Sequence, residues 1–228
     1  MSRTLTLSGD SSVLTAYYFP PIELQTDYVC GLIDFHTYYS IPNVDEENNI
    51  FHIGEYEIKL PVGSYEFDDI ANFVKNEYKA KKGNDSELEL YANNNTLQTE
   101  ITCAKDIIYF NRPKSIGPLL GFSSKELPPG ETHISDKSLT ITQNNIVRID
   151  CNIVCGSYLN SSLAHTLHEF SINVEPGYKI DEIPQNVIYL PVTGKEISTV
   201  TIRIVNQDNK LLNFRGENIT LRLHLKPA

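Results

Sequence analysis

The feature that most constrains the fold of this chain is the alternation of apolar and polar residues over short segments. It is clearest near the end of the sequence, where residues 219, 221, 223 and 225 are aliphatic and those between them are polar or charged. Successive side chains of a strand point to opposite faces of the sheet, and a slip of one residue would bury unpaired charges. We therefore predict a strand in which Ile219, Leu221, Leu223 and Leu225 face the core and Thr220, Arg222, His224 and Lys226 face solvent or a partner.

Similar segments recur along most of the sequence and predict a mainly β fold. Branched and aromatic residues are enriched in residues 28–39, 56–60, 86–92, 96–103, 139–142, 146–155, 166–174, 187–192 and 196–205. Three asparagines at 93–95 separate two of these segments, and asparagine tolerates the left-handed backbone of tight turns, so a hairpin is predicted over 86–103. Residues 206–209 predict a second hairpin, which would join the last two strands.

One amphipathic helix interrupts the strands of the first half. Five residues, Phe67, Ile70, Ala71, Val74 and Tyr78, follow the helical spacing, and charged residues fall on the other side. Acidic residues gather at the start of the segment, lysines gather at its end, and a glycine follows at 83 as a stop signal. The pattern predicts a helix over about residues 66–82.

The distribution of these elements bears on domain organisation. Residues 1–125 read as an α+β part and residues 138–228 as an all-β part, with the proline-bearing loop 125–131 between them. We interpret this loop as an exposed connection within a single β-rich structural unit over 1–228. A subdivision into two domains is the alternative.

The charge balance excludes some partners. The sequence has 19 Lys and Arg against 29 Asp and Glu, which gives a formal net charge of −10. Binding to nucleic acid needs a basic face, so direct contact with nucleic acid is not expected. The sequence has no long apolar run that could span a membrane, and its first residues lack the apolar region of a signal peptide. We expect a protein made inside the cell without a membrane partner.

Few residues suggest catalysis, a cofactor or a metal. The sequence lacks the nucleophile elbow, the phosphate-binding loop and the dinucleotide fingerprint. His165, His168 and Glu169 could serve a zinc hydrolase if they lay on a helix, but on a strand the two histidines face opposite sides. The segment 45–49, with three acidic residues followed by two asparagines, fits a solvated loop better than a Ca²⁺ site. We therefore predict no enzyme, no cofactor and no metal, with catalytic zinc as a minor alternative.

The cysteines and a cluster of aromatic residues leave alternatives open. Cys30, Cys103, Cys151 and Cys155 are interpreted as buried small apolar residues, with metal or redox use as the alternative. The aromatic residues at 17–19 and 38–39 belong either to the core or to a surface between subunits.

Several segments together resemble one protein family. They are Ser-Ile-Gly-Pro-Leu-Leu-Gly-Phe at 115–122, Pro-Gly-Tyr-Lys-Ile at 176–180, Ile-Tyr-Leu-Pro-Val at 188–192, and Asn-Phe-Arg-Gly-Glu at 213–217 before Leu-Arg-Leu-His-Leu at 221–225. The set resembles the minor capsid or penton-like jelly-roll proteins of Polinton/Maverick elements and adintovirus-like viruses. The likeness covers the last half of the chain best. It implies an eight-stranded antiparallel β-sandwich that forms a capsid vertex, and the predicted helix is more than a minimal jelly roll needs.

The resemblance implies a structural role in the virion. The chain would form a pentamer-like homo-oligomer and contact other capsid proteins. Candidate assembly and turn residues are Arg215, Gly216, Glu217 and Arg222, and solvated turn charges are the alternative reading of Arg215 and Glu217. A β-sandwich that displays loops 41–50 and 125–137 to a receptor or glycan is the alternative function.

Overall fold

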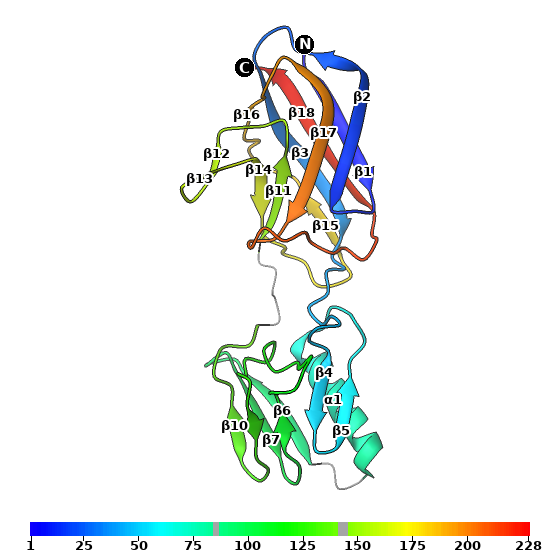
Figure 1. Ribbon diagram of the computed structural model, residues 1–228, viewed down its shortest axis with the longest axis vertical. Helices are drawn as coiled ribbons and strands as arrows, with labels where there is room; N and C mark the ends of the chain where they lie inside the picture. Colours follow the sequence, from blue (N-terminus) through cyan, green and yellow to red (C-terminus); the bar gives the residue numbers. More distant parts are fainter. Residues whose placement is uncertain (84–86, 141–145) are drawn as a thin grey trace. The chain divides into compact units, whose positions relative to one another are not determined.

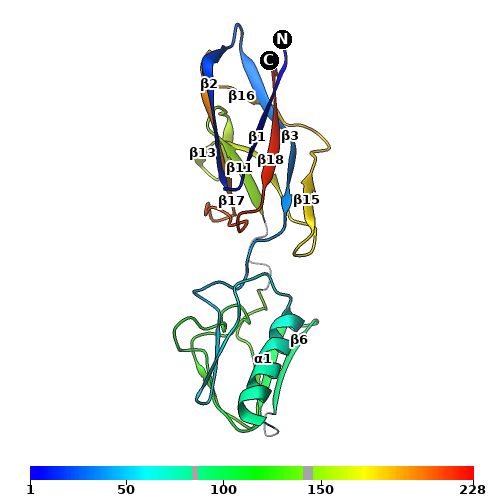
Figure 2. The ribbon, with the colours of Figure 1, turned by 90° about the vertical axis from the view of Figure 1, so that its right-hand side faces the viewer.

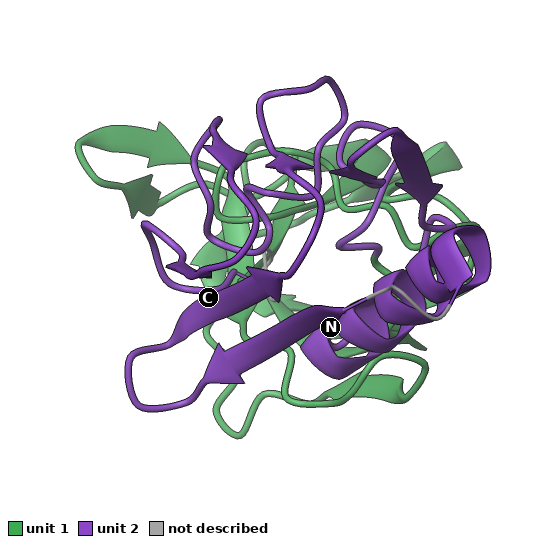
Figure 3. Ribbon diagram, turned by 90° about the horizontal axis from the view of Figure 1, so that it is seen from below, with its two compact units in different colours: residues 1–41, 144–228 green, residues 42–143 purple. Residues whose placement is uncertain are grey.

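The computed structural model describes residues 1–83, 87–140 and 146–228 and divides into two compact units. Unit 1 combines Met1–Ile41 with Asn144–Ala228, and unit 2 is the segment Pro42–Gln143 between them (Figure 3). The subdivision expected from the sequence placed residues 1–41 with the first part of the chain. Strand pairing places them with the last part instead, because their hydrogen-bond partners lie beyond residue 146.

Unit 1 contains two antiparallel sheets that pack face to face (Figures 1 and 2). The first sheet has the order β1 (Arg3–Gly9), β18 (Ile219–Pro227), β3 (Tyr28–Tyr38) and β15 (Lys179–Glu182), and β16 (Leu190–Pro191) also pairs with β3. The second sheet has the order β14 (Thr166–Phe170), β11 (Val147–Cys151), β17 (Glu196–Val205) and β2 (Val13–Glu23). A small hairpin of β12 (Ser157–Leu159) and β13 (Ser162–Ala164) projects beside the second sheet (Figure 1).

The order of pairing makes this sandwich a jelly roll. The first strand pairs with the last, β1 with β18, and β2 pairs with β17. Further inward along the chain, β3 pairs with β15 and β11 with β14. Nested pairing of this kind winds two Greek keys around one core. The antiparallel jelly-roll sandwich expected from the resemblance is therefore confirmed.

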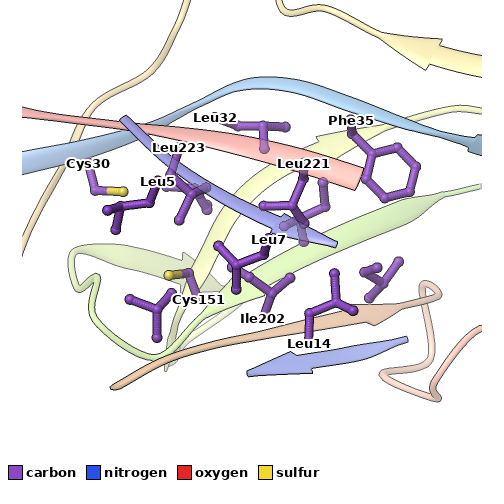
Figure 4. Close-up of a cluster of buried hydrophobic side chains, with 14 of the residues drawn as sticks. Leu5, Leu7, Leu14, Cys30, Leu32, Phe35, Cys151, Ile202, Leu221 and Leu223 are labelled. Atoms are coloured by element: carbon purple, nitrogen blue, oxygen red, sulfur yellow. The ribbon is translucent and has the colours of Figure 1, made fainter. Parts of the chain in front are cut away.

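The core of unit 1 lies between the two sheets and follows from the alternation in their strands. Figure 4 shows Leu5, Leu221 and Leu223 of the first sheet pointing toward Leu14 and Ile202 of the second. All four aliphatic residues predicted to face inward on the last strand are fully buried, and Arg222 between them is exposed. The predicted faces of this strand are confirmed.

The predicted pairing of the last two strands is wrong. β17 pairs with β2 and β11, whereas β18 pairs with β1 and β3, so the two strands lie in opposite sheets. The predicted turn at 206–209 does form, closed by a bridge between Val205 and Leu211, but the chain then crosses to the other sheet before β18 begins. Alternation of apolar and polar residues specifies which face of a strand is buried. Each of the two sheets buries one apolar face in the common core, so the alternation does not specify in which sheet, or beside which strand, a segment lies.

Unit 2 has its own core, formed by one helix and two small sheets. The helix α1 (Phe67–Lys82) lies beside β6, as Figure 2 shows. One sheet has the order β10 (Thr132–Ile134), β7 (Gln98–Cys103) and β6 (Leu88–Asn93). The other has the order β5 (Tyr56–Lys59), β4 (Ile50–Ile53), β8 (Ile108–Tyr109) and β9 (Glu126–Leu127). The helix that exceeded the needs of a minimal jelly roll therefore belongs to a unit inserted between β3 and β11.

The helix and the first hairpin match their sequence predictions. All five residues of the predicted apolar side of α1 are buried. The N-cap is Glu66, which forms a capping box with Asp69, and Gly83 is the C-cap with φ 81°. β6 and β7 pair in antiparallel register from Leu88 opposite Cys103 to Asn93 opposite Gln98. Within the described part of the chain, no helix is long and apolar enough to cross a bilayer.

Several predicted strands are shorter than their sequence patterns. β11 ends at Cys151, β14 ends at Phe170, and β16 contains only Leu190 and Pro191. The segment predicted at 139–142 is not a strand at its first two residues, and its last two lie outside the described residues. Ile172 packs against the sandwich outside any strand, and Val192 forms only an isolated bridge with Val154.

The segment at 115–122 that contributed to the resemblance serves the core of unit 2. Ile116, Leu119, Leu120 and Phe122 are buried, and the Phe122 ring stacks on Phe110 with centroids 4.9 Å apart. Gly121 has φ 83°, and a Cβ atom there would lie 2.3 Å from the carbonyl oxygen of Lys137. Only glycine fits this close approach of two backbone segments.

Candidate functional site

The predicted turn residues lie immediately before β18. Arg215 and Gly216 both have a left-handed backbone, with φ 55° and 78°. The Glu217 amide donates to the Phe214 carbonyl at 3.0 Å, and the buried Phe214 ring holds the turn on the core. Arg215 is exposed and Glu217 is half-buried. These residues therefore form a turn, and their role in assembly stays a prediction.

Arg222 is engaged within its own sheet. Its Nε donates to Asp34 Oδ2 at 2.6 Å, and one of its terminal nitrogens also donates to Asp34 Oδ2. The Asp34 side chain, on β3, is 2% exposed, whereas that of Arg222 is 51% exposed. Arg222 thus shields a buried carboxylate, a structural role that the sequence did not reveal, and its role in assembly stays a prediction.

His36 extends this network across the first sheet. Its Nδ1 lies 2.6 Å from Asp181 Oδ1 on β15, and its Nε2 lies 3.6 Å from Asp34 Oδ1. Hydrogen bonds from Lys179 and then from His36 lower the pKa of Asp181. The network links β18, β3 and β15 on the outer face of the sheet, where cross-strand charge pairs favour one register.

The histidine cluster considered for zinc is not brought together. His165 Nδ1 lies 2.7 Å from the Val154 carbonyl oxygen, and His168 Nε2 lies 2.8 Å from Glu182 Oε1. Glu169 instead accepts from Arg148 Nε at 2.5 Å. No group of three or more His, Cys, Asp and Glu side chains lies within reach of one metal ion among the residues that the structure describes.

The acidic loop at 45–49 bonds two of its own backbone amides through its side chains. The Glu47 amide donates to Asp45 Oδ1 at 2.9 Å, and the Asp45 amide donates to Asn48 Oδ1 at 2.7 Å. Asp45, Glu46 and Glu47 are exposed. Side chains that bond their own backbone are typical of a solvated turn.

Three of the four cysteines are buried, as the sequence interpretation expected. Cys30, Cys103 and Cys151 are buried, whereas Cys155 is half-exposed, and all four are free thiols. Burial raises the pKa of the Cys151 thiol to about 11 and also raises that of Cys30. Both side chains therefore remain protonated near neutral pH and pack as small apolar groups.

The second sheet of unit 1 carries two surface features, and sequence reasoning pointed to only the second of them. The first is a cavity of about 390 Å³ on its outer face, beside the β12–β13 hairpin. Arg148, Arg203, Leu159 and Leu163 are among its lining residues. They come from three separate segments of the chain, and no local pattern in the sequence connects them.

The second feature is a row of aromatic side chains on β2, at one edge of the same sheet. The Tyr17 residue is 80% exposed and Phe19 is 101% exposed. Tyr18 between them packs against the core. The aromatic segment at 17–19 therefore contributes Tyr18 to the core and Tyr17 and Phe19 to the surface, and their location between subunits stays a prediction.

Comparison with known proteins identifies the fold. No family model and no curated protein matches this sequence. A crystal structure of the mavirus penton protein does match, with a TM-score of 0.54 and 12% identity over 100% of this chain and 100% of that chain. The chain shares the fold of this penton protein. The resemblance predicted from the sequence is confirmed at the level of the fold.

The penton-protein fold includes the inserted unit. Because the match covers both chains completely, unit 2 falls within the matched length along with the jelly roll. The helix and its hairpin are therefore consistent with this fold and are not a departure from it.

Proposed function

We propose that this chain is a structural capsid protein of the penton type, which forms a cyclic homo-oligomer at a virion vertex and contacts other capsid proteins. The observation that carries the proposal is the match to a penton protein over the full length of both chains. Jelly rolls with nested strand pairing recur in capsid shells, where their edges and loops meet neighbouring copies.

Two further observations support a non-enzymatic role. The residues with the strongest catalytic signal in the sequence, His165 and His168, each bond a different partner. The exposed aromatic residues of β2 suit burial against another protein, since contiguous apolar patches on a surface mark interaction sites.

The mass of the purified full chain tests this proposal directly. Light scattering over a range of concentrations should give a discrete oligomer, and negative-stain electron microscopy should show rings. The chain should also co-purify with the capsid proteins that are encoded beside it. A monomer at the highest concentration, without binding to those proteins, would contradict the proposal.

A second candidate function is attachment to a receptor or glycan. The loops considered for this role, 41–50 and 125–137, fall almost entirely within unit 2, which has a hydrophobic core separate from that of the jelly roll. An inserted unit with its own core can vary its loops without disturbing the sandwich. A glycan array and a cell-binding assay with the full chain test this function, and retention of neither ligand would exclude it.

A further inference from the structure

The two outer edges of the second sheet of unit 1 differ in chemistry. β2 forms one edge and β14 the other, and the β12–β13 hairpin projects beyond the β14 edge (Figure 1). A cyclic oligomer needs two different surfaces on each copy, because a head-to-tail contact repeats around the ring. The opposite edges of one sheet can supply these two surfaces.

The β2 edge carries unprotected apolar groups. Tyr17 and Phe19 point outward, and β2 pairs only with β17 among the described strands. An edge strand with exposed aromatic side chains and free backbone groups is a template for another chain. Pro20 and Pro21 interrupt the free edge only beyond Phe19.

The same edge ends in an unbalanced charge. Glu23 on β2 lies directly opposite Glu196 on β17, and both are exposed. Like charges in directly opposed positions of two strands destabilise the pairing. No ion pair to either carboxylate occurs among the described residues, so a cation from outside the chain would relieve the repulsion.

The opposite edge offers complementary groups. On the hairpin, Tyr158 is 71% exposed and Leu163 is 60% exposed. The cavity of about 390 Å³ beside the hairpin extends from Leu163 across the outer face of the sheet to Arg203 on β17, and Asp150 also lines it. Arg203 is exposed and makes no ion pair within the described part of the chain, whereas Arg148 in the same cavity is already bound to Glu169. The hairpin and the adjoining face of the sheet therefore combine apolar side chains with one guanidinium group that has no carboxylate partner.

We propose that the β12–β13 hairpin and the adjoining cavity receive the β2 edge of a second copy of this chain. Tyr17 and Phe19 would be buried against the exposed leucines of the hairpin. The Glu23 and Glu196 pair would face Arg203, the guanidinium of the cavity that has no ion-pair partner in the described part of the chain. This inference rests on the proposed function, because it specifies the contact through which the cyclic oligomer forms.

A mixing experiment tests the contact between copies. Two variants of the full chain, Tyr17→Cys and Leu163→Cys, are prepared in a Cys155→Ser background, so that the half-exposed native thiol does not interfere. On mild oxidation, the mixture of the two should give at least tenfold more disulfide-linked dimer than either variant alone. The matched control mixes Leu163→Cys with Tyr178→Cys, whose residue is 63% exposed and precedes β15 of the other sheet. A yield from the test pair no higher than from the control would overturn the inference.

Assembly of surface variants separates this inference from the proposed function. The double variant Tyr17→Ser, Phe19→Ser should raise the dissociation constant of the oligomer at least tenfold, whereas Tyr178→Ser should leave it within twofold. All these side chains are exposed, so the melting temperatures should stay close to that of the natural chain. If the natural chain and the double variant assemble equally well, the interface is wrong and the proposed function stands. If the natural chain does not assemble, both fail.

Discussion

At the scale of single residues, burial and partners decide which polar groups matter. Asp34 is almost fully buried and depends on Arg222, although Arg222 itself lies on the outer face of the sheet. An arginine on the outer face of a strand contributes little to stability when it has no buried partner. Arg222 differs, because its removal leaves the buried carboxylate of Asp34 without its cation.

We now predict that Arg222→Ala lowers the free energy of unfolding by about 1–3 kcal/mol, the usual range for a polar group left unsatisfied. Urea titration measures the change. Arg215→Ala is the matched control, since that arginine is exposed on a turn and should change stability by less than about 0.5 kcal/mol. In the double variant with Asp34→Asn, much of the loss should be recovered. Equal effects of Arg222→Ala and Arg215→Ala would show that Asp34 does not need its partner.

The inward face of β18 gives a second prediction. Leu223 is fully buried, so Leu223→Ala should lower the free energy of unfolding by about 2–5 kcal/mol and reduce soluble yield. Leu163→Ala makes the same chemical change at an exposed position and should stay within about 0.5 kcal/mol. Denaturant titration of both variants decides the matter. A neutral Leu223→Ala would mean that this face of the strand is not in the core.

The carboxyl group of Asp136 should make the stability of the folded chain depend on pH. A hydrogen bond from Lys125, at 2.8 Å, and then one from the Ser123 amide, at 2.9 Å, lower the pKa of this carboxyl well below its ordinary value of 3.8. The folded state thus favours the carboxylate, so its contribution is fully present above pH 3.8 and is lost as the pH falls further.

Thermal unfolding at several pH values measures this contribution. Asp136→Asn should melt at a lower temperature than the natural chain at pH 7, and the difference should narrow below pH 3.8. Glu46→Gln, on the exposed acidic loop, should show a smaller difference. A constant difference between Asp136→Asn and the natural chain across this range would refute the assignment.

At the scale of elements, backbone geometry explains why the segment at 115–122, one of those that resemble penton-like proteins, has its particular sequence. The segment at 115–122 places apolar side chains in the core of unit 2 and turns at Gly121 against the backbone of Lys137. Gly130 has a similar φ, 88°, but has no atom within 4 Å of the position of an added Cβ. A substitution at Gly130 therefore tests backbone strain alone, whereas one at Gly121 tests backbone strain together with a steric clash.

Substitution of these two glycines gives the prediction at this scale. Gly130→Ala should cost about 1–2 kcal/mol, from the left-handed backbone alone. Gly121→Ala should cost about 1–3 kcal/mol more, because the added methyl group overlaps the Lys137 carbonyl. Urea titration of the full chain, followed by circular dichroism, compares the two. Similar losses for both would indicate that the Lys137 segment moves away at little cost.

At the scale of the whole molecule, the chain contains two separate hydrophobic cores. One lies between the sheets of the jelly roll, and the other lies among α1 and the two small sheets of unit 2. A unit with its own core and its own hydrogen-bonded sheets can fold as a cooperative unit. The single structural unit expected over 1–228 stays a prediction, which unfolding experiments can test.

We predict that replacement of residues 42–143 by a short Gly-Ser linker leaves the jelly roll folded. The shortened chain should retain a β-rich circular dichroism spectrum and a cooperative thermal transition, because its core residues all lie outside the removed segment. Calorimetry of the full chain should show two transitions. Loss of cooperative unfolding in the shortened chain would show that the two units depend on each other.

The sequence by itself determined the features that depend on neighbouring residues. The ends of α1, the β6–β7 hairpin and the inward face of β18 were all predictable, because capping, turn geometry and side-chain alternation act within a few residues. The likeness to penton-type proteins could also be found from short segments such as 115–122, and the match in fold confirms it.

Only the tertiary structure decided which strands are neighbours. β17 and β18 follow each other in the chain and show the same alternation of apolar and polar residues, yet they lie in opposite sheets. Backbone hydrogen bonds form equally well between strands that are close or distant in the sequence, so the pattern does not specify the partner. For the same reason the sequence did not predict the contact of Arg222 with Asp34, which lies 188 residues away, or the cavity beside the hairpin, whose residues come from separate segments. Local sequence patterns determine which side chains of a segment are buried and which are exposed. The packing of the two sheets determines which residues those side chains contact.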